Sequence, residues 1–435
     1  MKEQIQKAVD LVAQNCKGDD YRFDIYITDK QDTRYAQNRI TQNMGGTKLN
    51  VSLEVSFGNR SASSTVNSID EGSIKNLIET AENIAKMNQP DPEFVNSAGK
   101  VDYPEVNNVA AGTENCSMKE MVEVISKFID NAKRKNAFIS GLTTRTVVDE
   151  YLFTKNGFEG HDRSTSFSNT MTMSDNKSRE VKLTKCVKDF NDFDVDKEIE
   201  VLNSRFDALT EPKMIEKGTY NVILRPQAVY NFFAFMMYFF DRRSADYKIT
   251  PYHEAIGKQI FGEKFSLYSS IDDPSVTASP FSGDGIPAET IDWIRNGVLK
   301  NLFKNRSYAK KINENPNFMP NILIEGGDTD EKEMMKMVDN GLIINNFWYI
   351  RNVSTRQGEF TGLTRDGMYY FENGEIKHSV VNLRFNEIAI EVTKRILALG
   401  KAEPAMSIYG YSTMDNIRVP TMLIKDFTFV DTTTF

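Results

Sequence analysis

Histidine and cysteine, the residues that most often bind catalytic metals or act as nucleophiles, are scarce: the chain of 435 residues has three of each. His253 and Glu254 together have the start of a zinc-peptidase motif, in which a second histidine follows one helical turn later and the glutamate activates water. Gly257 and Lys258 occupy the later positions, and neither can replace an imidazole. We therefore expect a solvent-facing pair beside a strand that begins at Gln259, and not a metal site.

The other potential chemical groups are scattered along the chain. His161 and His378 each lie near a predicted turn, and we expect both at the surface. Cys16, Cys116 and Cys186 are far apart, so the sequence predicts neither a disulfide framework nor a multi-cysteine zinc module. We expect buried, inert thiols in a reducing cytoplasm. A Cys-His pair brought together by the fold stays open, because sequence spacing does not reveal spatial proximity.

Several other classes of site and partner are disfavoured. The sequence has no G-x-S-x-G nucleophile elbow, and its glycine pairs lack the Lys-Ser/Thr end of a phosphate loop. A net charge of -8 and a pI of about 5.3 argue against binding to a nucleic-acid backbone. The first residues contain no apolar segment typical of a signal peptide. We expect a cytoplasmic protein that neither spans a membrane nor binds nucleic acid.

The elements that must position these residues begin with a first half in which the sequence predicts both helices and strands. Apolar residues at helical spacing predict a helix over the first residues, ended by Gly18, and another over residues 74–85. Alternation from Leu49 to Phe57 predicts a half-buried strand, and Gly58-Asn59 predicts a hairpin turn after it. A capping box, Ser117-x-x-Glu120, predicts the start of a third helix.

In the rest of the first half, the sequence pattern predicts an irregular connection over residues 89–113 and short strands over residues 137–187. A helix near 195–209 then leads to Glu211-Pro212, which we take as the domain boundary. We therefore predict an α+β fold of two mixed halves, residues 1–211 and 212–435, with predominantly antiparallel sheets and packed helices.

The second half contains the longest apolar run of the chain. A strand over Tyr220–Leu224 ends at Pro226, and the run Val229–Phe240 follows, interrupted by Asn231. Twelve residues are too few for a membrane span, which needs about 20. Because the run is apolar all round, we expect a helix that is buried on most sides or packed at a subunit interface. Later in the chain, helical spacing predicts a helix from about Phe385 to Leu399.

The order of these landmarks resembles the TldD/PmbA family, often called modulator of DNA gyrase, over nearly the whole chain. Each landmark is weak alone, and their order and spacing carry the resemblance. In the second half the landmarks are Gly218–Pro226, Asp272-Asp273-Pro274, Phe281–Pro287, Asn296–Leu299 with Ser307-Tyr308-Ala309, Asp339–Ile344, Gly358–Gly362 and Phe371–Ile376.

The resemblance also shows where this chain departs from the family. TldD-like members have His-Glu-x-x-x-His on the helix after the proline and a cysteine near the C-terminus, as zinc ligands of a peptidase. Alignment on Pro226 places Ala234 at the first histidine, Phe235 at the glutamate and Phe239 at the second histidine. Alignment of the end on Val419-Pro420 places Ser412 at the cysteine. These substitutions make the chain similar to the PmbA (TldE) branch, which lacks the zinc motif.

This branch pairs with a TldD-like subunit, so the resemblance implies a heterodimeric cytoplasmic metallopeptidase that trims or matures peptides. This chain would then be a pseudoenzyme subunit, inactive alone, that shapes a peptide cleft near Phe235, Phe239 and Ser412, with no cofactor of its own and zinc in the partner. Two alternatives stay open: an autonomous metallopeptidase that uses His253 and Glu254 with unpredicted ligands, and a structural or regulatory homodimer whose apolar helix forms the interface.

Overall fold

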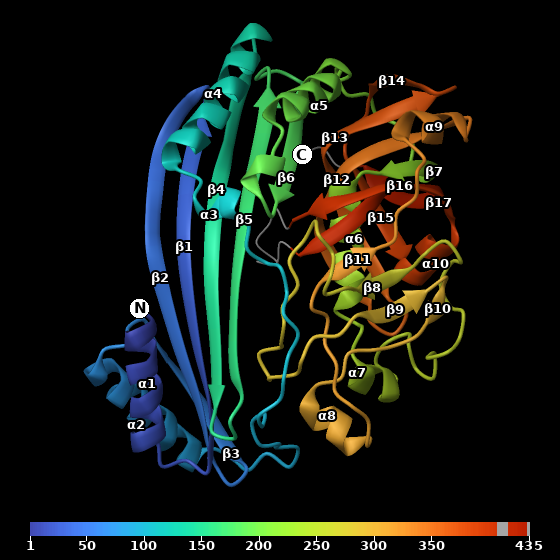
Figure 1. The fold of residues 1–435 in the computed structure, drawn as a ribbon. Coiled ribbons are helices and arrows are strands. Elements are labelled where there is room, and N and C mark those ends of the chain that lie inside the picture. The colour runs from blue at the N-terminus through green and yellow to red at the C-terminus, as the bar shows by residue number, and fades with distance from the viewer. Residues whose placement is uncertain (407–415, 433–435) are drawn as a thin grey trace.

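The computed structural model describes residues 1–406 and 416–432. Its first half is built on a six-stranded antiparallel sheet with the strand order β3-β2-β1-β4-β5-β6 (Figure 1). The strands of this sheet are β1 (Asp20–Ala36), β2 (Arg39–Phe57), β3 (Arg60–Val66), β4 (Phe138–Thr154), β5 (Glu159–Ser174) and β6 (Glu180–Val187).

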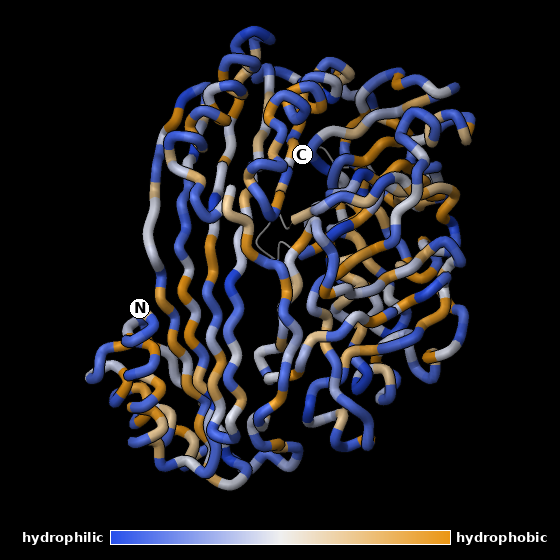
Figure 2. The backbone as a smooth tube through the Cα atoms, viewed as in Figure 1, coloured by the Kyte–Doolittle hydropathy of each residue, from blue (hydrophilic) through white to orange (hydrophobic). Residues whose placement is uncertain are grey.

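Four of these strands are unusually long, between 16 and 19 residues each. The prediction of short strands over residues 137–187 is therefore wrong. Strands β4 and β5 run without interruption on either side of a hairpin turn at Asn156-Gly157, and apolar and polar residues alternate along them (Figure 2). The strand predicted over Leu49–Phe57 is the second part of β2, and its Gly58-Asn59 hairpin turn is confirmed.

Helices cover one face of this sheet at its two ends. Helices α1 (Lys2–Asn15) and α2 (Glu71–Met87) pack over Phe23 and Ile25 of β1. At the other end α4 (Met118–Arg134) and α5 (Val195–Asp207) enclose a core that contains Tyr35. Side chains an even number of positions apart in a strand point to the same face of the sheet. Phe23, Ile25 and Tyr35 of β1 are spaced in this way, so both helix pairs lie on the same face. The capping box of α4 is confirmed, and the irregular connection is interrupted only by α3 (Ala111–Glu114) and isolated bridges.

The second half contains an eleven-stranded mixed sheet, in which antiparallel pairs predominate. The expectation of an α+β fold with mainly antiparallel sheets is therefore confirmed. The strands are β7 (Gly218–Leu224), β8 (Leu267–Ser269), β9 (Ile291–Arg295), β10 (Val298–Leu299), β11 (Ile322–Ile324), β12 (Asn340–Ser354), β13 (Glu359–Glu372), β14 (Glu375–Ser379), β15 (Leu383–Ile388), β16 (Ile396–Ala405) and β17 (Ile417–Thr432).

Five helices accompany this sheet, and the longest of them is α6. The helix predicted from Phe385 to Leu399 is wrong except for its central residues, because the residues before them pair with β13 and β17 and those after them pair with β17. Strand pairing thus overrides a helical spacing of apolar residues. The helices are α6 (Pro226–Met237), α7 (Arg242–Asp246), α8 (Arg306–Lys311), α9 (Glu331–Lys336) and α10 (Ala389–Lys394).

The two halves share a core. Successive residues of β7 point to opposite faces, so Val222 and Leu224 pack with α6, whereas Ile223 packs in the same cluster as Phe128 of α4 and Phe206 of α5. Strand β7 is therefore buried on both faces. No helix in the described part of the chain is long and apolar enough to cross a membrane.

Candidate functional site

Helix α6 is the element that carries the predicted site. Strand β7 ends at Leu224, and Pro226 is the first helical residue, where its missing N–H and fixed φ suit a helix start. Asn231, the polar interruption of the apolar run, is buried and donates hydrogen bonds to Asn346 Oδ1 and to the Phe347 carbonyl at 3.1 Å. These bonds satisfy an amide that would otherwise be costly to bury, and they fix the helix against β12.

The partly exposed face of α6 presents the first two of the predicted positions. Ala234 and Phe235 are half-buried on this face, and Phe239 follows just after the C-cap residue Tyr238. The rings of Phe235 and Phe239 both lie against Phe360 of β13, with centroid distances of 6.1 and 5.5 Å. Phe235 and Phe239 thus form one apolar surface with Phe360, and Ala234 adjoins Phe235 in the chain. Ser412 lies outside the described residues.

An apolar recess adjoins this surface at the C-terminal end of α6. It has a volume of about 470 Å³, and Tyr238 at its edge is 67% exposed. No local sequence pattern predicts this recess, because three of its seven lining residues come from segments distant in the chain from α6. Its lining residues are Met237, Tyr238, Phe240, Asp241, Phe303, Phe318 and Met319.

The residues that the resemblance aligns with zinc ligands do not fit a metal ion. The side chains of Ala234, Phe235 and Phe239 consist of carbon and hydrogen and offer no atom that can coordinate zinc. Among residues 1–406 and 416–432, no group of three or more His, Cys, Asp or Glu side chains is placed to hold one. We therefore derive no chemical step through a metal at this site.

The three histidines lie in separate places. His253 is on a turn, where its Nδ1 lies 3.2 Å from the Ala245 carbonyl, and Gln259 makes only an isolated bridge, so the strand predicted there is wrong. Glu254 beside it is exposed with a positive φ of 52°, a turn geometry and not a helical one. His161 is exposed on β5, as expected, whereas His378 on β14 is half-buried and stacks on Tyr370.

The cysteines are consistent with structural thiols. Cys116 and Cys186 are buried and Cys16 is half-buried. Burial raises the pKa of the Cys116 thiol to about 11 and also raises the pKa of Cys16. A raised pKa keeps these two groups as the neutral thiol, which is the poor nucleophile of the two forms.

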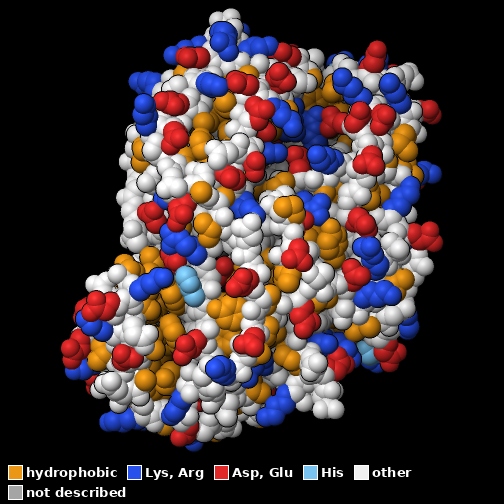
Figure 3. All heavy atoms as spheres, in the orientation of Figure 1, with side chains coloured by type: hydrophobic (Ala, Val, Ile, Leu, Met, Phe, Trp, Pro, Cys, Tyr) orange, Lys and Arg blue, Asp and Glu red, His pale blue; other side chains and the backbone are white. Residues whose placement is uncertain are grey.

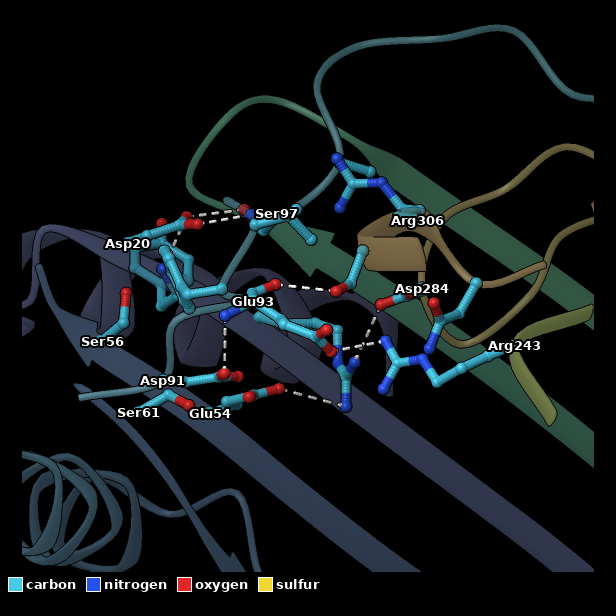
Figure 4. Close-up of a pocket in the computed structure, with 17 residues that line it drawn as sticks. Asp20, Glu54, Ser56, Ser61, Asp91, Glu93, Ser97, Arg243, Asp284 and Arg306 are labelled. Carbon is cyan, nitrogen blue, oxygen red and sulfur yellow. Dashed lines mark hydrogen bonds and ion pairs between the residues drawn. The ribbon is translucent and has the colours of Figure 1, made fainter. Parts of the chain in front are cut away.

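A polar cleft of about 360 Å³ lies elsewhere between the two halves (Figure 4). Its walls come from β1, β2, the irregular connection and loops of the second half, and its charged groups are already paired. Arg22 lies 3.6 Å from Asp284, and Glu93 accepts ion pairs from Arg243 at 2.7 Å and Lys311 at 2.9 Å. Because these contacts join residues of the two halves, we interpret this cleft as a polar seam that holds the halves together.

Buried carboxyl groups stand near this seam, on the sheet face opposite the helices. Glu150 of β4 accepts a hydrogen bond from the Tyr26 hydroxyl, and Asp162 is its cross-strand neighbour. Burial, with the nearby charges of Asp162 and Asp24, raises the pKa of Glu150 to about 7, against the opposing effect of the Tyr26 bond. Burial likewise raises the pKa of Asp24 to about 6, although Arg22 opposes it.

These raised pKa values predict how stability depends on pH. A carboxyl group with a raised pKa binds its proton more tightly in the folded state, so its burial costs stability above the folded pKa and costs none below the unfolded pKa. We expect Glu150→Gln, which keeps an acceptor for Tyr26, to stabilise the protein by about 1–2 kcal/mol at pH 8 and by almost nothing at pH 5. Urea unfolding at both pH values measures this difference. An equal effect at both, or the same effect from Glu79→Gln on the exposed side of α2, would refute the assignment.

Solved structures of other proteins show the same fold. The chain matches TldE from Thermococcus kodakarensis with a TM-score of 0.86 and 16% identity, covering 99% of each chain. It matches a protein described as a candidate modulator of a DNA gyrase from Thermotoga maritima with a TM-score of 0.83 and 17% identity, covering 99% of this chain and 100% of the other. A third match, from Bacteroides thetaiotaomicron and described in similar words, has a TM-score of 0.83 and 17% identity over 99% and 98% of the two chains.

Sequence comparison assigns the second half directly. Residues 217–431 match the family described as PmbA/TldA metallopeptidase C-terminal domain. No curated protein sequence matches the chain at a significant level. The matched range contains β7, helix α6 with Ala234 and Phe235, and Phe239, so the apolar surface lies within the domain that names the family. Through residues 217–431, this chain belongs to the TldD/PmbA family of metallopeptidase-like proteins.

Proposed function

We propose that this chain is a non-catalytic subunit of a TldD/PmbA-type peptidase complex that processes or degrades peptides. The observation that carries the proposal is the apolar surface on α6, where Ala234, Phe235 and Phe239 occupy the positions of the family's ligands and base. In this proposal the zinc belongs to a TldD-like partner subunit, and this chain acts in the cytoplasm as a pseudoenzyme in the resulting dimer.

The recess beside α6 supports a binding role for this surface. An exposed aromatic side chain next to an apolar hollow is typical of a surface that buries part of a peptide or of a partner protein. Tyr238 is 67% exposed and lines a recess whose other walls are mainly Met and Phe side chains. A hydrocarbon surface can bind an apolar peptide segment without hydrolysing it, which suits a subunit that shapes the cleft.

Reconstitution with the metal-bearing homologue from the same genome tests this proposal. We expect the two chains to co-elute as one complex, and peptidase activity on an unfolded substrate to appear in the mixture but not with this chain alone. Separate elution combined with no gain of activity on mixing would overturn the proposal. A stoichiometric transition metal in this chain alone, lost in His253→Ala, would instead favour an autonomous enzyme.

A substitution on the apolar surface sharpens this test. We expect Tyr238→Asp to reduce the activity of the mixture about tenfold or more, because it places a charge where an apolar contact forms. The matched control is Met87→Asp on α2, which is 76% exposed and remote in sequence from the recess. If Tyr238→Asp and Met87→Asp behave alike, the surface beside α6 is not used.

A further inference from the structure

A small charged cavity lies between the two halves at the N-terminal end of α6. Its volume is about 120 Å³, and its walls come from α5 and β6 on one side and from α6, β12, β13 and β16 on the other. Five cationic side chains and three carboxylates line it. Figure 3 shows Lys and Arg side chains gathered in a hollow between the surface over α5 and β6 and that over β12 and β13.

Two of these cations are neutralised within the protein. Arg225 makes a two-pronged ion pair with Glu331, with Nε and Nη2 at 2.7 and 2.6 Å from the carboxylate oxygens. Lys185 lies 3.0 Å from Glu403 and 3.9 Å from Glu198. Two of the three carboxylates that line the cavity, Glu198 and Glu403, are therefore paired with Lys185. Glu331, which is paired with Arg225, does not line the cavity.

Arg205 is different. It lies in α5 and lines the cavity, and in the part of the chain that the structure describes its guanidinium makes no hydrogen bond and no ion pair. Burial lowers the pKa of Arg205 to about 10, and the nearby charge of Arg225 lowers it further, against the weaker attraction of Glu331. Arg205 is partly buried, and a partly buried cation without a partner costs stability, so its presence at a cavity suggests a use there.

We infer that this cavity binds one carboxylate group of a peptide, either its C-terminus or an acidic side chain, through Arg205. The guanidinium offers two parallel N–H donors, which match the two oxygens of a carboxylate. The N-terminal end of α6 opens at the same cavity and adds a positive potential. The inference rests on the proposed function only in that the carboxylate is attributed to a peptide.

The charge of the cavity favours a carboxylate over a phosphate. With Glu331 counted, five cationic groups and four carboxylates surround the cavity, an excess of one positive charge, and Glu198, Asp366 and Glu403 lie within its walls. A singly charged carboxylate can balance this excess, whereas a phosphate dianion would meet the wall carboxylates with surplus negative charge. The small volume also favours the end of a peptide over a whole segment.

The test uses the full chain alone and two matched probes. N-acetylglycine has a peptide-like free carboxylate, and N-acetylglycinamide is its neutral counterpart. At constant ionic strength we expect the carboxylate to raise the melting temperature in a concentration-dependent way and the amide to have no effect, because a ligand that binds only the folded state stabilises it. We expect Arg205→Met to weaken this binding about tenfold or more, and Arg205→Lys to retain part of it.

Controls separate binding from folding. Without ligand, Arg205→Met should be at least as stable as the wild type, because it removes an unpaired desolvated charge and keeps most of the side chain's volume. Arg134→Met, an exposed arginine on α4, should bind N-acetylglycine like the wild type. An unchanged response in Arg205→Met, or an equal response to the amide, would overturn the inference.

Two further outcomes are decisive. Stronger protection by inorganic phosphate than by N-acetylglycine, lost in Arg205→Met, would overturn the carboxylate assignment in favour of a phosphate site. The result is also independent of the peptidase partner. Carboxylate binding without complex formation would support the carboxylate site and refute the proposed function. Complex formation without carboxylate binding would support the proposed function and refute the carboxylate site.

Discussion

Phe232→Ala is expected to lower the free energy of unfolding by about 3–5 kcal/mol, since it deletes a fully buried aromatic ring and leaves a cavity. Phe232 lies on the sheet-facing side of α6 and has no exposed surface. Four strands supply rings around it. Because these side chains belong to different elements, they cannot move together to fill the cavity that the substitution leaves. Its ring neighbours, at centroid distances of 5.1 to 6.2 Å, are Phe233, Phe347, Phe360, Phe385 and Phe427.

Urea unfolding, followed by far-ultraviolet circular dichroism, measures this cost. Phe235→Ala is the matched control, because it removes the same side chain from the same helix at a half-buried position. We expect the control to cost about 1–2 kcal/mol, in proportion to the smaller area that the ring buries. Equal costs for the two variants would mean that α6 does not pack on the sheet by the face that contains Phe232.

Glu331→Ala is expected to destabilise the protein by about 3 kcal/mol, because it leaves the Arg225 guanidinium buried without its counter-charge. Arg225 precedes α6 as its N-cap residue, and its side chain is only 9% exposed. The attraction of Glu331 raises the pKa of Arg225 against the opposing effect of burial. Glu331 is itself 29% exposed, so water recovers part of the loss, and we place the effect at the lower end of the range for buried pairs.

A double variant distinguishes the pair from either residue alone. We expect Arg225→Met with Glu331→Leu to be clearly more stable than Glu331→Ala, because apolar side chains of similar size need no counter-charge. A double-mutant cycle in urea then gives the coupling energy between the two groups. A coupling near zero would show that the ion pair does not hold the start of α6. The exposed pair Glu3–Lys7 on α1 provides a control in which little coupling is expected.

Much of the local structure follows from the sequence, and the errors have one physical origin. The helices with apolar residues at helical spacing, the capping box at Ser117 and the hairpin turn at Gly58 form where predicted. The predicted helix at 385–399 fails, because its flanking residues pair with strands that are distant in sequence. The length of β4 and β5 was missed for the same reason, since their partner strands stabilise polar residues in extended conformation.

The candidate site divides in the same way between sequence and tertiary structure. Spacing and resemblance locate Ala234 and Phe235 on one helix and Phe239 just after it, because neighbours in a helix are neighbours in the chain. Phe360 beneath them, and the loops that complete the recess, come from residues that no local pattern connects to α6. The role of Ser412 stays a prediction.

The sequence by itself determined that imidazole and thiol groups are scarce and that the run after Pro226 carries hydrocarbon side chains at 234, 235 and 239. The alignment of these positions with zinc ligands of the family stays a prediction. Only the tertiary structure decided that Arg205 of the first half makes no ion pair with any described residue and lines a cavity that the second half closes. The physical reason is that a helical periodicity is set by residues a few positions apart. The pairing or isolation of a charge depends on which distant strands are brought beside it.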